Sequence, residues 1–186
     1  MKGCKVLNND EIKSLLNVAE NQRERMLVMV GLYFGTRISE TVSLTFGDFH
    51  NTDHLRIRRL KKSNTSTLRI PDDFRAELDK LRNEYESQGI KISKKTPLFL
   101  SRKGQNQPLT NRHASRLLQE MFQRAGIRGK VGAHSFRKTF TTKIFELTGK
   151  DIMQTANYTG HKSLNCLVYY IETTKETNLT TQLAWG

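Results

Sequence analysis

Four short segments of this 186-residue chain carry side chains that together could act on a phosphate group. In chain order they contain Arg37, Lys61 with Lys62, His134 with Arg137, and His161 with Tyr170. Each segment taken alone is typical of solvated or ion-paired surface residues. Taken together, they form a set of groups suited to phosphoryl transfer.

The two arginines suit the binding of a phosphate and of the transition state derived from it. A guanidinium donates two parallel hydrogen bonds to phosphate oxygens and stays charged, so it also stabilises the charge of a pentacoordinate transition state. His134 and Arg137 are three residues apart, which places them on one face of a helix and within reach of one phosphate. His161 adds a further hydrogen-bond donor.

The lysines and the tyrosine suit proton transfer and nucleophilic attack. A lysine at the tip of a hairpin can give a proton to a departing alkoxide, and a tyrosine hydroxyl can attack phosphorus to form a phosphotyrosine. Tyr170 lies outside the apolar stripe of the helix expected over residues 163–171, so it is not simply a core residue. Tyr169 lies still further from that stripe, and periodicity does not choose between the two tyrosines.

The sequence indicates no metal site and no cofactor. Its acidic residues are scattered and form no carboxylate cluster of the kind that holds divalent cations. Cys4 and Cys166 are far apart and lack the spacing of zinc ligands or of a disulfide framework. We expect the arginines to take the place of a metal.

The composition points to a polyanionic partner. Lysine and arginine number 31 against 18 aspartate and glutamate, which gives a net charge of +13. This charge favours nucleic acid, whose neutralised phosphates release counterions, over anionic membrane surfaces, which also attract basic proteins. The most apolar stretch, residues 26–34, is far shorter than the roughly 20 residues of a membrane span, and the N-terminus does not resemble a signal peptide. We expect an intracellular, cytoplasmic protein that associates with DNA and not with membranes.

Hydrophobic periodicity predicts a mainly helical chain. Asn8 and Glu11 form a capping box before a helix over residues 9–20, and Gly35 ends a buried helix over residues 23–34. A tight turn then opens a brief helix that ends at residue 44. Further helices are expected from residue 72 to Gly89, from 110 to 125, and over 134–147, 151–158 and 163–171.

A small antiparallel sheet is expected along one edge. Residues 55–58 alternate apolar side chains with arginines, and the alternation resumes over 68–70 after turn residues at 63–66, which predicts a basic β-hairpin. Residues 97–100 are a third strand candidate. The expected fold is α+β, mainly helical, with about three strands in the sheet. Residues 1–186 are expected to form a single domain, with a core over 1–171 and a C-terminal tail over 172–186.

These segments resemble, in order and spacing, the catalytic domain of tyrosine site-specific recombinases, the family of phage integrases and chromosome-dimer resolvases. GTRISETVSLTFGDF is similar to the first-arginine box of that family, HSFRKTFTT to its His-x-x-Arg box, and TGHKSLNCLVYY to its segment from Gly-His to the tyrosine. The resemblance extends from residue 7 to residue 170. The RRLKK run and LFLSRKG are also similar to the fimbrial phase-switch invertases.

The sequence departs from the family in two respects. Family members usually carry an N-terminal helical core-binding domain, and this chain has no room for one. We therefore expect either an excised catalytic domain or a member of the short subset to which the fimbrial invertases belong. Before His161 the chain has Tyr158 and Thr159, where aliphatic residues are usual in the family.

The resemblance implies site-specific DNA recombination, by integration, excision or inversion, through a 3′-phosphotyrosine and without metal, ATP or cofactor. It implies that Tyr170 is the nucleophile and that Lys61 is the general acid, with Lys62 as the alternative because counting back from Pro71 favours it. Glu40 would support Arg37. The groups around the scissile phosphate would be Arg37, His134, Arg137 and His161.

The implied partner is double-stranded DNA, bound by a homotetramer that assembles on it from protomers that are monomeric in solution. Accessory DNA-bending proteins are a further expectation. Two alternatives are a type IB topoisomerase-like enzyme that relaxes DNA and a basic DNA-binding module without catalytic activity. The basic residues expected to contact DNA are Arg56, Arg58, Arg59, Lys62, Lys138 and Lys162.

Overall fold

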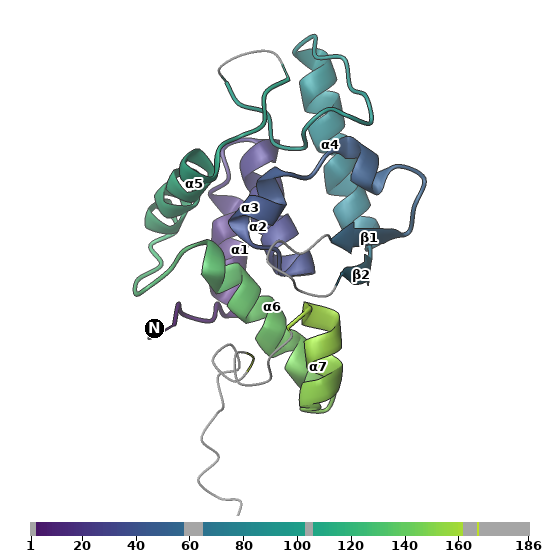
Figure 1. The fold of residues 1–186 in the computed structure, drawn as a ribbon. Coiled ribbons are helices and arrows are strands. Elements are labelled where there is room, and N and C mark those ends of the chain that lie inside the picture. The colour runs from purple at the N-terminus through teal and green to yellow at the C-terminus, as the bar shows by residue number, and fades with distance from the viewer. Residues whose placement is uncertain (1–2, 58–64, 103–105, 162–166, 168–186) are drawn as a thin grey trace, which may run out of the picture.

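The computed structural model describes residues 3–57, 65–102, 106–161 and 167 (Figure 1). Within these residues the chain forms seven α-helices, one short 3-10 helix and a hairpin of two strands. In chain order the elements are α1 Asn9–Asn17, α2 Gln22–Phe34, α3 Ile38–Val42, η1 Phe46–Phe49, β1 His54–Ile57, β2 Ser66–Arg69, α4 Asp72–Ser87, α5 Asn111–Arg124, α6 Ala133–Leu147 and α7 Ile152–Thr159.

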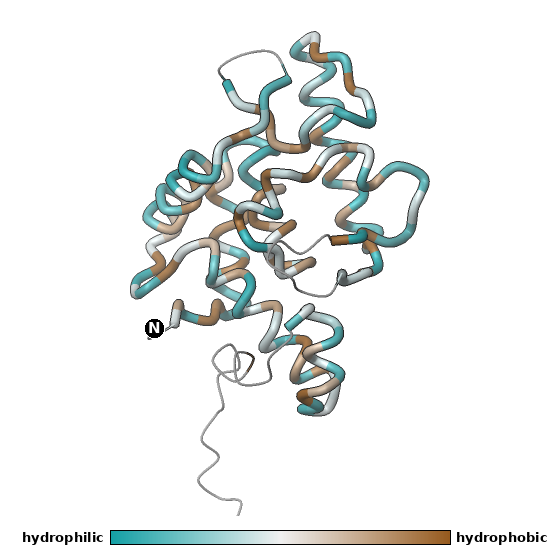
Figure 2. The backbone as a smooth tube through the Cα atoms, in the orientation of Figure 1, coloured by the Kyte–Doolittle hydropathy of each residue, from teal (hydrophilic) through white to brown (hydrophobic). Residues whose placement is uncertain are grey.

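Helix α2 occupies the centre of the molecule. Figure 1 shows α4, α5 and α6 arranged around it, and α2 contacts all three. Most of its residues are buried, so it is apolar on nearly every side, as a central helix must be. Hydrophobic segments accordingly gather at the middle of the molecule (Figure 2). The ring of Phe74 on α4 meets Phe34 edge to face at 4.9 Å and stacks on Phe49 at 5.4 Å, which ties α4 and η1 to α2.

The helix ends follow the predicted signals at two places. The Asn8 side chain accepts from the backbone N–H of Glu11 at 2.8 Å, and the Glu11 carboxylate accepts from the backbone N–H of Asn8 at 3.1 Å, so the capping box is confirmed. Gly35 ends α2 in the left-handed conformation, with φ of 56°. Helix α1 ends three residues earlier than expected because Asn21 already caps α2, which leaves residues 18–20 to make the turn between the two helices.

The β-hairpin has the predicted alternation. Strands β1 and β2 are antiparallel, with Leu55 opposite Leu68 and Ile57 opposite Ser66. Leu55, Ile57 and Leu68 are buried, whereas Arg56 points to solvent. The assignment of Ser66 to the turn is wrong, because this residue pairs in the ladder and is itself buried.

The third expected strand is also wrong for the residues that the structure describes, where the sheet has only two strands. Residues 97–100 make isolated bridges instead, between Thr45 and Pro97 and between Leu100 and Pro108. Each bridge involves a proline, which has no N–H to continue a ladder. The apolar run there reflects burial and not sheet pairing, since the consecutive Leu98 and Phe99 are both buried.

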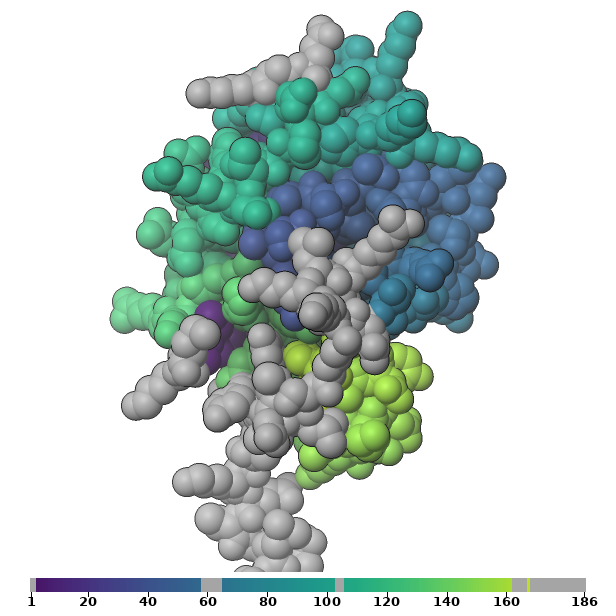
Figure 3. Space-filling model, viewed as in Figure 1, coloured from purple at the N-terminus to yellow at the C-terminus, as the bar shows by residue number. Residues whose placement is uncertain are grey.

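Helices α3 to α7 form where the sequence predicts them, within one to three residues at each end. The expected helix over 163–171 lies outside the described residues, apart from residue 167. Helix α7 packs on α6 and β2 and protrudes below the hairpin as a separate lobe (Figure 3). The α+β, mainly helical class is therefore confirmed. In the part of the chain that the structure describes, no helix is long and apolar enough to cross a lipid bilayer.

Candidate functional site

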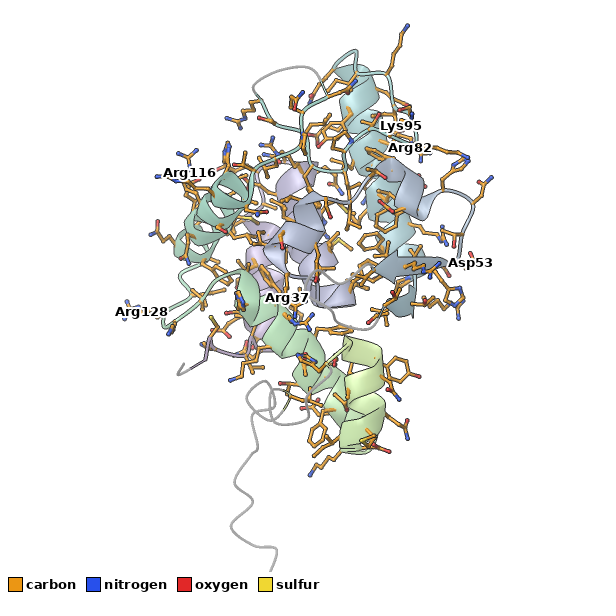
Figure 4. The ribbon with its side chains drawn as sticks, viewed as in Figure 1. Arg37, Asp53, Arg82, Lys95, Arg116 and Arg128 are labelled. Carbon is orange, nitrogen blue, oxygen red and sulfur yellow. The ribbon has the colours of Figure 1, made fainter. Side chains whose placement is uncertain are left out.

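Arg37 is the N-cap residue immediately before α3, in the middle of the face shown in Figure 4. Its guanidinium donates to Glu40 Oε1 at 2.7 Å, and its backbone N–H donates to Glu40 Oε2 at 2.9 Å. Glu40 is buried, whereas 30% of the Arg37 side chain is exposed. A buried carboxylate paired in this way holds a cation at the surface. The supporting position of Glu40 beside Arg37 is thus present in the structure.

Arg137 lies on α6 and is almost completely buried, with 1% of its surface exposed. Its Nη1 donates to the backbone carbonyl of Gly35 at 2.6 Å, and its Nη2 donates to the backbone carbonyl of Thr159 at 3.2 Å. Nη2 also lies 3.3 Å from His161 Nε2. The guanidinium therefore joins the end of α2, two residues before Arg37, to the end of α7, two residues before His161.

Close packing of α2 on α6 places Arg137 beside Gly35. Added Cβ atoms at Gly31 and Gly35 would lie 2.8 Å from Phe136 Cβ and 2.2 Å from Phe140 Cδ1, so neither position has room for a larger residue. Gly35 also needs its positive φ to end α2. The sequence predicts Gly35 as the residue that ends the helix. It does not predict that the Gly35 carbonyl accepts a hydrogen bond from Arg137.

Helix α7 ends at Gly160, whose φ of 68° turns the chain so that His161 faces α6. The backbone N–H of His161 donates to the Ala156 carbonyl at 3.1 Å, which closes the helix end. The His161 Nδ1 atom lies 2.6 Å from Thr159 Oγ1. Both nitrogens of the imidazole thus have a polar neighbour, Thr159 on one side and Arg137 on the other.

Tyr158 and Thr159 replace the aliphatic residues that are usual in the family, and the two side chains differ in burial. Tyr158 is 49% exposed, whereas Thr159 is fully buried, as an aliphatic residue would be. The Thr159 hydroxyl donates to the Thr155 carbonyl at 2.7 Å, so it is hydrogen-bonded although it is buried. Sequence reasoning did not identify Thr159 as a neighbour of the site residues, although its difference from the family was visible.

The remaining predicted site residues that the structure describes are His134, Lys138 and Arg56, and they differ in exposure. His134 is the second residue of α6 and is exposed, and α6 carries both His134 and Arg137 at the expected spacing of three residues. That both reach one phosphate stays a prediction. Lys138 is half-buried on α6, and Arg56 is exposed on β1. In the expected set, Lys61, Lys62, Arg58, Arg59, Lys162, Tyr169 and Tyr170 lie outside the described residues.

The structure therefore brings together three of the sequence-separated segments. Arg137 from the second arginine segment contacts the Gly35 carbonyl next to the Arg37 segment and contacts His161 directly. A guanidinium in contact with an imidazole, and bonded to a carbonyl two residues along the chain from Arg37, suits the binding of a phosphate and the stabilisation of negative charge during a reaction. Among the described residues, no group of three or more His, Cys, Asp and Glu side chains is placed to hold a metal ion.

Comparison with known proteins identifies the family of this chain. The family model described as "Phage integrase family" matches residues 5–177. Tyrosine recombinase XerH of Campylobacter jejuni is 30% identical over 175 residues, which are 88% of this chain and 48% of the relative. Tyrosine recombinase XerA of Pyrococcus horikoshii is 24% identical over 174 residues, which are 91% of this chain and 57% of the relative. The chain spans about half the length of the curated relatives it matches.

Solved structures show the same fold. A crystal structure of XerA recombinase matches 97% of this chain and 66% of its own, with a TM-score of 0.78 and 22% identity. A post-cleavage complex of XerH site-specific recombinase with palindromic difH substrate matches 97% of this chain and 52% of its own, with a TM-score of 0.80 and 22% identity. The family match covers nearly the whole chain, and we conclude that it belongs to the phage integrase family and has the fold of a tyrosine recombinase catalytic domain.

Proposed function

We propose that this chain cleaves and rejoins DNA strands in site-specific recombination, with Tyr170 as the nucleophile. The single observation that carries the proposal is the position of Arg137. Its guanidinium contacts the Gly35 carbonyl, the Thr159 carbonyl and the His161 ring, so three segments that are far apart in sequence meet at one cation. Family membership supplies the chemistry that this cluster would serve.

The proposed reaction is a pair of transesterifications. The Tyr170 oxygen attacks the phosphorus of a DNA phosphodiester and loses its proton, while the bond from phosphorus to the 5′ oxygen breaks. The products are a 3′-phosphotyrosine and a free 5′-hydroxyl. A 5′-hydroxyl from a second strand then attacks the phosphotyrosine and releases Tyr170. Because the protein bond retains the energy of the phosphodiester, the reaction needs no ATP.

The charged groups have separate tasks in this proposal. Arg37, held by Glu40, and Arg137 bind the non-bridging phosphate oxygens and stabilise their growing charge. His134 and His161 contribute further hydrogen bonds to the same phosphate. Lys61 gives a proton to the leaving 5′ oxygen, with Lys62 as the alternative donor.

Double-stranded DNA is the proposed substrate, and the basic residues near the site would contact its backbone. XerH, a relative of this chain, has been solved bound to its difH substrate, which supports this choice. Recombination exchanges strands between two sites, so we propose that four protomers assemble on DNA, with accessory DNA-bending proteins as further partners. Arg56 is exposed on β1 and Lys138 is half-buried on α6, and in this proposal both contact DNA phosphates.

The nucleophile can be tested without knowing the target site. The protein is incubated with a library of nicked duplexes of random sequence, in EDTA, and the covalently bound DNA is isolated and sequenced. Tyr170→Phe removes one hydroxyl and should bind DNA but form no covalent complex, whereas Tyr169→Phe should still form it. The reverse result would assign the attack to Tyr169. Covalent complexes with both variants would contradict the proposal.

The recovered sequence then separates recombination from simple relaxation. Two DNA molecules that carry this sequence and different labels are incubated together with the protein. A recombinase yields molecules that carry both labels, whereas a topoisomerase-like enzyme rejoins each strand to itself. Rejoining without exchange would reject site-specific recombination and keep the cleavage chemistry.

A further inference from the structure

We propose that Thr159 is a positioning residue that sets the tautomer and orientation of His161, and through it the orientation of Arg137. The inference deepens the proposed function, because both residues belong to the proposed site. It rests on four contacts among described residues: Thr159 to Thr155, Thr159 to His161, Arg137 to His161 and Arg137 to the Thr159 carbonyl.

The Thr159 hydroxyl has one proton and two polar neighbours, the Thr155 carbonyl and His161 Nδ1. Its oxygen lies 2.7 Å from the Thr155 carbonyl, which can only accept a hydrogen bond, so the single hydroxyl proton points there. The same oxygen lies 2.6 Å from His161 Nδ1 and must act as the acceptor in that contact. His161 therefore carries a proton on Nδ1.

The other ring nitrogen of His161, Nε2, faces Arg137. An arginine side chain has only donors, so the contact of Arg137 Nη2 with His161 Nε2 at 3.3 Å requires a lone pair on Nε2. The two contacts agree on one state of the ring, the neutral Nδ1–H tautomer. A hydrogen bond at one ring nitrogen fixes which nitrogen carries the proton, and here the Thr159 hydroxyl makes that bond.

Without DNA, the Nε2 atom of His161 accepts from Arg137, so in this state the imidazole holds the guanidinium. Thr159 thus acts on Arg137 in two ways: its carbonyl accepts from Nη2 directly, and its hydroxyl turns the imidazole so that Nε2 meets the same Nη2 atom. An aliphatic residue at position 159 would fill the buried space but would leave Nδ1 without this acceptor.

Three variants separate positioning from packing. Thr159→Val keeps the shape and removes the acceptor, and Thr159→Ser restores the hydroxyl. Thr155→Val is the matched control, because Thr155 is also buried on α7 and its hydroxyl bonds to Asp151 and Thr148 but not to His161. Thermal unfolding of each variant confirms that it is folded before the other measurements.

The first measurement is independent of DNA. Long-range ¹H–¹⁵N spectra of the protein labelled at histidine nitrogens report the tautomer of each of its five histidines at pH 8, and a His161→Gln variant assigns the His161 signals. We expect the Nδ1–H pattern for His161 in the wild type, in Thr159→Ser and in Thr155→Val. Thr159→Val should lose it. An unchanged His161 pattern in Thr159→Val, or an equal change in Thr155→Val, would overturn the inference.

The second measurement is the rate of covalent complex formation on the nicked duplex library. We expect Thr159→Val to be slower by about tenfold, the usual order for the loss of one buried hydrogen-bond partner, and Thr159→Ser to recover most of the rate. Equal rates for Thr159→Val and wild type would overturn the inference. If the wild type formed no covalent complex, the proposed function would fail, and the tautomer spectra would still decide the role of Thr159.

Discussion

Arg137 on α6 is held from two sides, by the end of α2 and by α7, and the contacts on the two sides differ in kind. The face toward α2 is apolar and so close that α2 carries glycine at both contact points, Gly31 and Gly35. The face toward α7 has polar contacts beside an apolar one: Thr148, at the end of α6, meets Thr155 at 3.0 Å, and Phe145 packs against Ala156. Arg137 donates to one backbone carbonyl on each side, that of Gly35 and that of Thr159.

This difference separates two tasks. Close apolar packing tolerates no added atom but has little preference for direction, so the α2 side fixes where the Arg137 backbone lies. Hydrogen bonds are directional, so the α7 side fixes which way the guanidinium and the imidazole turn.

The exposed large hydrophobic side chains among the described residues lie at the end of α6 and on α7, where Figure 2 also shows hydrophobic segments: Leu147, Ile152, Met153 and Tyr158.

The largest effect is expected from Gly35→Ala, on the close-packed side. The added Cβ would lie 2.2 Å from Phe140 Cδ1, and alanine would also have to adopt φ of 56°. Overpacking and left-handed strain together should lower the free energy of unfolding by about 3 kcal/mol or more. Urea unfolding monitored by circular dichroism measures this loss.

Gly89→Ala is the matched control for this change. Gly89 has φ of 77° and nothing within 4 Å of an added Cβ, so its substitution adds backbone strain alone. We expect a loss of about 1 kcal/mol. Equal losses at the two positions would mean that the contact with Phe140 does not limit the approach of α2 and α6.

The second prediction concerns the ion pair of Arg37 with the buried Glu40 at the start of α3. Glu40→Gln leaves an acceptor for one of the two hydrogen bonds and removes the charge that pairs with the arginine. We expect the free energy of unfolding to fall by about 1–2 kcal/mol, a value that allows for the partial exposure of Arg37. Urea unfolding of Glu146→Gln is the control, since its pair with Lys143 is exposed and 3.6 Å long. Similar losses in both variants would show that burial of Glu40 adds nothing.

The apolar side of this comparison is largely visible in the sequence. Periodicity and helix-end signals predicted α2, with Gly35 at its end, and the alternation over 55–58 predicted the hairpin. The family boxes pointed to Arg37 and Arg137 as partners in one site. These features could be predicted because burial and left-handed turns restrict the residue types at each position.

The polar side could not be predicted to the same extent. Every residue has a backbone carbonyl, so no residue type marks Gly35 or Thr159 as an acceptor for Arg137. A threonine is as common on a surface as in a buried network, and only the position of α7 against α6 decides which it is. The apolar run at 97–100 was mistaken for a strand for a related reason, because burial and sheet pairing give the same pattern in a short segment.

The third prediction compares two buried threonines, Thr155 on α7 and Thr141 on α6. Thr155 Oγ1 donates to the Asp151 carbonyl at 2.6 Å and meets Thr148 Oγ1 at 3.0 Å. Thr141 Oγ1 has no hydrogen-bond partner among the residues that the structure describes. Thr155→Val should therefore lower the free energy of unfolding by about 1 kcal/mol, and Thr141→Val should leave it unchanged or raise it by up to about 1 kcal/mol. Chemical unfolding of both variants checks the opposite signs, and equal losses would contradict the distinction.

The smallest effect is expected at the partly exposed contact of α4 with α2, which tests how far polar contacts depend on burial. Glu77 accepts from Arg25 Nε at 2.9 Å, from Lys80 Nζ at 2.8 Å and from Gln22. Burial raises the pKa of Glu77, but the hydrogen bonds from Lys80 and Gln22 and the charge of Arg25 outweigh it, so the pKa lies below its ordinary value.

A carboxyl group whose pKa is lowered by folding stabilises the protein above its unfolded pKa, and this stabilisation is lost as the pH falls through the folded pKa. Glu77→Gln should therefore be less stable than wild type at pH 7, by at most about 1 kcal/mol, and the difference should shrink steadily below about pH 4. Urea unfolding at a series of pH values measures it, with the exposed Glu86→Gln on the same helix as the control. A difference that stays constant with pH would mean that Glu77 acts on α2 through its shape and hydrogen bonds, and that its charge contributes nothing at this contact.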